Sequence, residues 1–480
     1  MNIDYDLLAH GMIGGGRSKD KTPPPPITNF KASTDQELQI TLTWVNPIDT
    51  DFVGLRIQRK KGSYPTSITD GVTVFNGASS VYVDNIQPNV DYYYRAFTYD
   101  YDNNFNTSTT QQTIGMAILP KIYGVAIADA NTNPETAVTY TDNAIGMVGG
   151  STSWDSLYPF NDIRPFLVKD GVEVVELNKN NFTKNISGGT VDITSGASGD
   201  VMIRFPKIWW KMYKEGGNQY VKYAEKQIDS TWKALAHINS RTGLECDYVY
   251  ISAYLGYSDG SKLRSLSGKL PTVSTALSTF RTLAQANGTN YNQIGFYQLT
   301  MLQILYLIRY KNLDSQTALG RGYVDENAGK TNTGGTNLKG MYYGETTGKL
   351  QMKFAGLEDF WGNCFYYIDG FRTNSSNAMQ IATKDFNDDG TGATVYPSGI
   401  GNTGGYMSDI QGTTETAFNM KTAGGSATTR YSDYADSNGG CFAAFGGSWR
   451  DASDAGAFQL YVARDASGNS YFAARLALFK

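Results

Sequence analysis

The chain has 480 residues, a net charge of −4 and only 18% charged residues, which gives room for two to four domains. That balance leaves no basic stripe to neutralise phosphates, so nucleic-acid binding is not expected. No apolar run approaches a membrane span and the first residues lack a signal-peptide pattern, so we expect a protein made in a cytoplasm without membrane insertion. Abundant glycine (52) and tyrosine (33) favour a β- and loop-rich extracellular or virion protein.

Cysteine and histidine are too scarce for most metal or nucleophile chemistry. The three cysteines and two histidines lie far apart in the sequence, at Cys246, Cys364, Cys441, His10 and His237. They cannot supply a disulfide framework, a zinc cage or a histidine-based triad. The sequence therefore predicts no cofactor, no metal site and no enzyme.

Residues 1–26 form an N-terminal segment that ends in a proline run. A short apolar cluster is followed by three glycines and a charged stretch, and Pro23 to Pro26 then predict a stiff polyproline spacer. Such a segment is expected to attach the protein to other virion proteins. Plain disorder of a terminus explains the same residues equally well.

Residues 27–116 predict a small β-sandwich. Residues 40–44, 55–59 and 92–97 read as strands, and turns rich in Asp, Asn, Gly and Pro separate them. The strand spacing resembles that of a fibronectin type III or Ig-like domain, with Trp44 in an early core strand. We expect this module to act as a spacer.

Two stretches carry, at alternate positions, side chains whose oxygen atoms could bind calcium. They are Asp100, Asp102 and Asn104, and then Asp385, Asn387 and Asp389. A calcium loop needs a bidentate glutamate at its end, where the second stretch has Tyr396. Polar turns explain both stretches as well or better.

Residues 117–480 are expected to form one large domain. Residues 122–127 predict its entry strand, and residues 205–211 a buried strand with lysines toward solvent. Helical spacing of apolar residues predicts two helices, over 274–287 and 298–311.

The stretch 446–480 alternates between apolar and other side chains. Phe458, Leu460 and Val462 are expected on a buried face, and Phe472, Ala474, Leu476 and Leu478 on the buried face of a second strand. The residues between them, together with the turn-rich segment 464–470, would then face outward and form a binding surface.

Several motifs of this region resemble one family. These are Gly446-Gly447-Ser448-Trp449, the run from Tyr431 to Gly440, Trp361-Gly362-Asn363 and Ala474-Arg475-Leu476. They resemble C-type-lectin-like domains of the formylglycine-generating-enzyme type, and above all the variable proteins of diversity-generating retroelements found in phages. The resemblance implies a tight left-handed turn at Gly362-Asn363 and core positions for Trp361 and Trp449.

The resemblance also implies the ligand-facing residues. They are Arg450, Asp451, Ser453, Asp454, Gln459, Tyr461, Ala463, Arg464, Asp465, Asn469 and Tyr471. The expected fold is mainly β: an Ig-like sandwich, then an α+β C-type-lectin-like ligand-binding domain whose variable-type region spans 446–480. Whether a retroelement diversifies that region is not visible in one sequence.

These features together favour a phage receptor-binding protein. It would be located in the virion, at a tail or tail-fibre tip, be made in the host cytoplasm, form a homotrimer and bind a bacterial surface receptor (protein or glycan). A tail or capsid decoration protein without its own ligand is the main alternative. A formylglycine-generating-type oxidase would need a closely spaced, copper-binding cysteine pair, which Cys364 and Cys441 do not provide.

Overall fold

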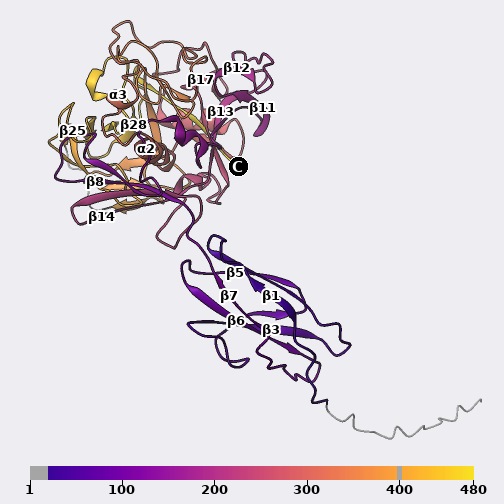
Figure 1. Ribbon diagram of the computed structural model, residues 1–480. Coiled ribbons are helices and arrows are strands. Elements are labelled where there is room, and N and C mark those ends of the chain that lie inside the picture. Colours follow the sequence, from indigo (N-terminus) through magenta and orange to yellow (C-terminus); the bar gives the residue numbers. More distant parts are fainter. Residues whose placement is uncertain (1–19, 397–402) are drawn as a thin grey trace, which may run out of the picture. The chain divides into compact units, whose positions relative to one another are not determined.

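The computed structural model describes residues 20–396 and 403–480 (Figure 1). The chain divides into two compact units, Met1–Pro120 and Lys121–Lys480, each described here by itself. Most of the expected N-terminal attachment segment, residues 1–19, lies outside the described residues. Among the described residues, no helix is both long enough and apolar enough to cross a bilayer.

The first unit is a fibronectin type III-like β-sandwich, as predicted. One sheet has the order β1-β2-β5, with β1 at Thr28–Ala32, β2 at Gln39–Val45 and β5 at Val81–Asn85. The other has the order β4-β3-β6-β7, at Val72–Gly77, Gly54–Lys61, Asp91–Tyr99 and Gln112–Met116. Trp44 of β2 is 4% exposed, and its ring contacts Phe30 of β1 and Phe75 of β4. The expected core tryptophan therefore joins the two sheets.

The proline run, predicted as a stiff spacer, packs on the sandwich at Pro24. Pro24 is buried against the sandwich, and its carbonyl oxygen accepts hydrogen bonds from Thr98 Oγ1 (3.2 Å) and Asn106 Nδ2 (2.8 Å). Proline has no N–H to satisfy, so such a run can lie on a sheet as long as its carbonyls find donors. The polyproline pattern describes the backbone shape and does not say what it packs against.

In the residues that the structure describes, the second unit is built on two large sheets and three small ones. The seven-stranded sheet has the order β12-β11-β10-β13-β16-β31-β19, at Asn181–Asn185, Val172–Asn178, Arg164–Lys169, Asp200–Pro206, Tyr248–Ser252, Leu476–Phe479 and Tyr291–Gln293. A four-stranded sheet has the order β14-β15-β8-β9, at Trp209–Glu215, Asn218–Ala224, Ile122–Ala128 and Val138–Asp142. Two hairpins pair β17 with β18 (Tyr257–Ser258, Leu263–Arg264) and β20 with β21 (Lys353–Phe354, Leu357–Glu358).

The second large sheet is curled and mixed. Its main path is β24-β23-β22-β28-β29-β27-β25-β26, at Thr394–Tyr396, Met379–Ile381, Phe365–Thr373, Phe442–Phe445, Leu460–Arg464, Tyr434–Ser437, Thr403–Ile410 and Met420–Ala423. The strand β30, at Phe472–Ala473, pairs with β22 in parallel, and β27 pairs with β29 in parallel. Because β28 and β29 flank residues 446–459, this sheet fixes the position of the stretch that carries the predicted ligand-facing residues.

Two predicted strands differ in the structure. The stretch 205–211 is divided between β13 and β14, which belong to different sheets. The stretch 472–479 is likewise divided into β30 and β31, and both of its faces are buried. Leu476 and Leu478 pack in one apolar cluster, whereas Ala477 and Phe479 pack in another. The strand is buried on both faces, but the small side chains on its second face are typical of a solvent-facing side, so the sequence pattern predicted only one buried face.

The two predicted helices are confirmed. They are α1, at Leu277–Gln285, and α2, at Phe296–Tyr310, and a short α3 follows at Ser315–Ala318. Nearly every residue of α2 is buried, and it contacts strands of both the curled and the four-stranded sheet (Figure 1). Short 3-10 turns occur at Thr152–Ser156, Leu235–His237 and Ala452–Asp454.

The Trp361-Gly362-Asn363 turn has the expected geometry. Gly362 and Asn363 have φ angles of 84° and 61°, in the left-handed region, and Trp361 is fully buried. A Cβ atom on Gly362 would lie 3.0 Å from the backbone of Tyr323, so a glycine fits where other residues would be strained.

The buried side chain of Arg475 links the residues just before this turn to the end of strand β16. Arg475 lies between β30 and β31 and donates to the carbonyl oxygens of Ser252 (3.0 Å), Asp359 (2.8 Å) and Glu358. Its guanidinium carbon lies 4.7 Å from the ring centre of Tyr366. Arg475 therefore connects the end of β16 with the turn that precedes Trp361.

His237 should make the stability of the second unit pH-dependent. The side chain is fully buried, and burial lowers its pKa to about 3. Between pH 6.5 and 3 the unfolded chain then binds a proton that the folded chain does not, so stability falls as pH falls. We expect this residue to contribute a loss of roughly 3 kcal/mol at pH 4 relative to neutral pH.

Urea unfolding of the wild type and of His237→Phe between pH 7 and 4 measures this effect. The difference between the two proteins is the relevant quantity, because buried carboxyls such as Asp433, whose pKa burial raises, oppose the trend in both proteins. Parallel pH profiles for the two proteins would contradict the prediction.

Candidate functional site

A pocket of about 160 Å³ lies where the stretch 448–472 folds over the curled sheet. Eight of the eleven predicted ligand-facing residues line it: Arg450, Asp451, Asp454, Gln459, Tyr461, Arg464, Asn469 and Tyr471. We call it the Tyr461–Tyr471 pocket. These residues come from the connection between β28 and β29, which contains a 3-10 turn, from β29 and from the loop after β29, so local folding brings them together.

Each of the two tyrosines of the pocket has an arginine beside it. The guanidinium carbon of Arg450 lies 4.0 Å from the ring centre of Tyr471, and that of Arg464 lies 5.6 Å from the ring centre of Tyr461. Both arginines are exposed, while both tyrosines are half-buried. The pocket thus offers aromatic faces next to exposed cations, a combination that suits hydroxylated or anionic ligand groups.

The acidic residues of the pocket are held by neighbouring donors. Asp451 Oδ2 accepts from the backbone N–H of Ser448 (2.7 Å) and from its hydroxyl, and burial raises the pKa of Asp451. Asp454 Oδ1 accepts from the hydroxyl of Tyr406 at 2.6 Å. These bonds fix both carboxyl groups before a ligand arrives.

Two predicted orientations in this stretch are wrong. Gln459 was expected to face outward, but it is 2% exposed, and its Oε1 has no hydrogen-bond partner. The strand β29 begins only at Leu460, so the period-two pattern was applied one residue too early. Gly447 lies against the Gln459 amide, since a Cβ at Gly447 would be 2.5 Å from Oε1.

Trp449, expected in the core, is half-buried and packs on Tyr471 with ring centres 5.0 Å apart.

Three predicted residues do not line the pocket. Ser453 is exposed, with its hydroxyl 3.1 Å from that of Tyr406, and Ala463 is half-buried on β29. Asp465 accepts from the backbone N–H of Ser467 at 3.1 Å, and bonds from Ser467 lower its pKa. These residues belong to the surroundings of the pocket and not to its wall.

The sequence did not single out the pocket residues that come from other strands. Phe365 of β22 and Tyr434 of β27 complete the wall, with Ser448 and Phe472. The ring of Tyr461 lies 5.7 Å from that of Phe365 and 6.3 Å from that of Phe472. Tyr434 and Ser448 lie within motifs that carry the family resemblance. Phe365 gave no signal, because only the pairing of distant strands brings it here.

The oxygen-rich stretches predicted as turns are hydrogen-bonded loops. Asn387 donates from its side chain to the carbonyls of Asp385 (2.9 Å) and Thr391 (2.8 Å). Asp100 accepts from Asn104 through both the backbone N–H (2.8 Å) and the side-chain amide (2.6 Å). In the same loop as Asp385, Asn387 Oδ1 accepts from the backbone N–H of Gly390 (2.8 Å) and Asp389 Oδ1 from that of Thr391 (2.7 Å), so side-chain oxygens of both loops are already hydrogen-bonded.

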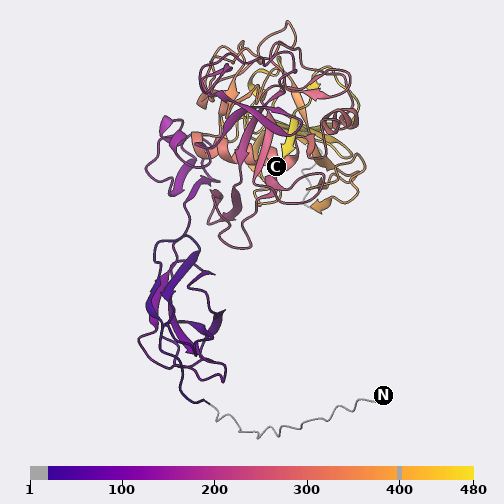
Figure 2. The ribbon, with the colours of Figure 1, turned by 90° about the vertical axis from the view of Figure 1, so that its right-hand side faces the viewer.

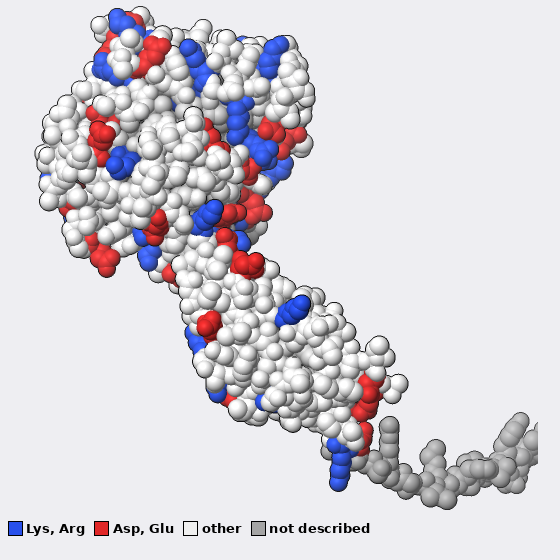
Figure 3. All heavy atoms as spheres, in the orientation of Figure 1, with Lys and Arg blue, Asp and Glu red and all other residues white. Residues whose placement is uncertain are grey.

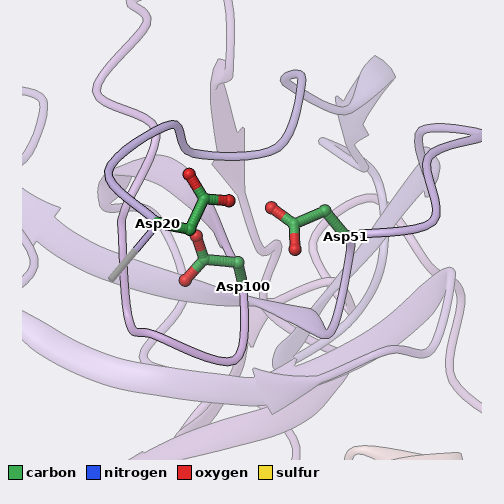
Figure 4. A group of neighbouring side chains, drawn as sticks. All are labelled: Asp20, Asp51 and Asp100. Carbon is green, nitrogen blue, oxygen red and sulfur yellow. The ribbon is translucent and has the colours of Figure 1, made fainter. Parts of the chain in front are cut away.

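Asp100 also belongs to a cluster that the sequence did not predict. Its carboxylate lies near those of Asp20 and Asp51, with one oxygen of each within 4.8 Å of the others (Figure 4). Burial, and then repulsion from Asp20 and Asp100, raises the pKa of Asp51. Three carboxylates can hold a hard cation such as Ca²⁺. Exposed acidic groups also occur without one, so the cluster by itself does not establish a site.

Charged residues are scattered over the face of the molecule that Figure 3 shows. Lysines and arginines alternate there with aspartates and glutamates, and most of the surface is uncharged. On that face there is no continuous basic surface of the kind that binds nucleic acid.

Comparisons with known proteins give limited information. No family model matches the chain, and no curated protein matches it. Among solved structures, the FN1-FN3 domains of chicken CNTN1 match at 10% identity over 48% of this chain and 58% of that chain, with a TM-score of 0.16. That score is too low to support an argument, so the strand order of the first unit carries the assignment. The chain is a mainly β protein, with a fibronectin type III-like sandwich followed by a unit built around a curled mixed sheet with few helices.

Proposed function

We propose that this protein is a phage receptor-binding protein that binds a bacterial surface receptor in the Tyr461–Tyr471 pocket. One observation supports the proposal most strongly: eight residues chosen from the sequence for their likeness to ligand-facing positions line one pocket. Two tyrosine–arginine pairs beside fixed carboxylates resemble the aromatic anchors and adaptable polar groups of binding surfaces.

The finer assignments follow from the same resemblance. In this proposal the second unit is a C-type-lectin-like domain, and 446–480 is its variable-type region, open to diversification by a retroelement. The protein is a homotrimer in the virion, at a tail or tail-fibre tip, and its N-terminal segment binds other virion proteins. Several weak pockets in one trimer would strengthen adhesion through avidity.

The oxidase alternative is disfavoured by the environment of the cysteines. Cys364 is fully buried and Cys441 half-buried, and burial raises the pKa of both thiols. Copper binding requires thiolates, which such surroundings make costly. A decoration protein without a ligand remains the second candidate, and the adsorption experiment below separates it from a receptor-binding protein.

Host adsorption tests the proposal directly. We expect Tyr471→Ala combined with Arg450→Ala to weaken binding to host cells about 100-fold, the loss typical of two central anchor residues. Tyr471 is preferable to Tyr461, because Tyr461 also packs on Phe365 and Phe472 and its loss would affect stability.

Ser453→Ala is the matched control, since Ser453 was predicted to face the ligand but lies outside the pocket. It should adsorb like the wild type, and all three proteins should melt within a few degrees of one another. Unchanged adsorption of the double variant would refute the pocket as the receptor site and favour the decoration protein.

A further inference from the structure

A second hollow in the second unit lies away from the Tyr461–Tyr471 pocket. Its volume is about 620 Å³, within the roughly 300–1,000 Å³ typical of small-molecule sites. It forms where the end of α2 meets the loops 150–160, 179–180 and 340–344. We call it the Arg309 pocket. The two pockets have no lining residue in common.

The residue that gives this pocket its character is Arg309, in the last turn of α2. It is 2% exposed, yet it lines the hollow. Its Nη1 lies 2.8 Å from Asp155 Oδ1, a charge contact without hydrogen-bond geometry, and both Nη1 and Nε are buried nitrogens without a hydrogen-bond partner. Its guanidinium carbon lies only 3.6 Å from the ring centre of Tyr342. A buried guanidinium that is not fully hydrogen-bonded favours a further anionic partner, and a carboxylate fits its geometry.

A second cation lines the same hollow. Lys179 is half-buried, and its ammonium donates a long hydrogen bond of 3.3 Å to the carbonyl of Asn161. Among the described residues that line the hollow, Asp155 is the one acidic group, and its side chain is 48% exposed. The lining therefore carries two cations against one carboxylate, while Asp162 and Glu176 interact with Lys179 from outside the lining.

Aromatic rings form the apolar part of the wall. Phe160, Tyr310 and Tyr342 surround the guanidinium, with ring centres 5.4, 5.9 and 3.6 Å from its central carbon. Exposed polar groups of Thr152 and Asn180 lie at the same hollow. Flat apolar faces beside amide and hydroxyl groups suit a sugar ring, which has apolar C–H faces and hydroxyls at its edge.

From these features we propose that the Arg309 pocket binds an acidic sugar, a hexuronic acid unit of a glycan. The carboxylate faces Arg309 and Lys179, and the ring lies against the aromatic side chains. Asp155 competes with the ligand carboxylate for Arg309. This proposal does not depend on the receptor-binding role of the Tyr461–Tyr471 pocket.

Calorimetric titration of the full chain with methyl glucuronide, methyl glucoside and acetate tests the proposal. The two sugars differ only at C6, so comparing them measures what the carboxylate contributes to the affinity. Comparing the glucuronide with acetate measures what the sugar ring contributes. We expect the glucuronide to bind at least about 10-fold more tightly than either, as one charge-assisted contact allows. No binding of the glucuronide, or equal binding of either comparison ligand, would overturn the proposal.

Two variants with opposite expected effects on glucuronide affinity test whether the sugar binds in this pocket. Lys179→Gln should weaken glucuronide binding about 5-fold, whereas Asp155→Asn should strengthen it about 3-fold, because the competing carboxylate is gone. Lys184→Gln, at a half-buried lysine that does not line the pocket, and Tyr471→Ala should leave the affinity unchanged. If Lys179→Gln and Asp155→Asn shift the affinity in the same direction, or if neither shifts it, the assignment to this pocket fails.

Discussion

Replacing Trp361 by alanine is expected to lower the free energy of unfolding of the second unit by about 3–5 kcal/mol. The indole is fully buried, with ring centres of Tyr306 and Phe360 at 6.0 and 5.8 Å. Its Nε1 also donates to the carbonyl of Gly320 at 3.1 Å, which would lose this donor. Urea unfolding of the full chain measures the change.

Trp449→Ala is the informative comparison. The sequence placed both tryptophans in the core, but Trp449 is half-buried and contacts Tyr471 at the pocket. Its replacement should therefore cost about 1–2 kcal/mol, since part of its surface already faces water. Trp361→Phe should fall between the two, because it keeps an aromatic ring but loses the indole donor. Equal losses for Trp361→Ala and Trp449→Ala would mean that the burial difference described here is wrong.

Arg475→Met is expected to destabilise the second unit by a similar amount, about 3–5 kcal/mol. The substitution keeps an apolar stem but removes the donor to the carbonyls of Ser252, Asp359 and Glu358. Those acceptors are buried, so each would stay unsatisfied. The positive charge also lies close to Asp359, a fully buried carboxyl.

Arg475→Lys separates charge from geometry. Lysine keeps the charge but cannot donate in three fixed directions, so we expect it to recover only part of the lost stability. Thermal melting and urea unfolding of the three proteins provide the measurement. A methionine variant within about 0.5 kcal/mol of the wild type would show that the three hydrogen bonds contribute little.

Local patterns predicted the elements whose surroundings are simple. The residues of β2 alternate between apolar and polar, and Trp44 packs between two sheets as the sandwich pattern requires. The helix α1 ends at Gln285, close to the predicted end at residue 287. The Gly362-Asn363 turn was predictable because few residue types adopt its positive φ angles.

Features that depend on distant chain segments could not be predicted in this way. Alanines at 473 and 477 resemble a solvent face in the sequence, but a second apolar cluster covers them. Gln459 looked outward because the start of β29 depends on its pairing with β28. The Arg309 pocket combines loops that lie far apart in the sequence, so its residues form no motif.

The position of β31 has a consequence for how this protein is made. Residues 476–479 pair with 249–251 on one side and with 291–293 on the other, so they separate two strands that the ribosome produces much earlier (Figure 2). Until the late strand emerges, β16 and β19 each present unpaired backbone groups to the cell. The seven-stranded sheet can therefore close only after nearly the whole second unit has been synthesised. Nascent chains that stall before residue 476 should depend on chaperones to avoid aggregation.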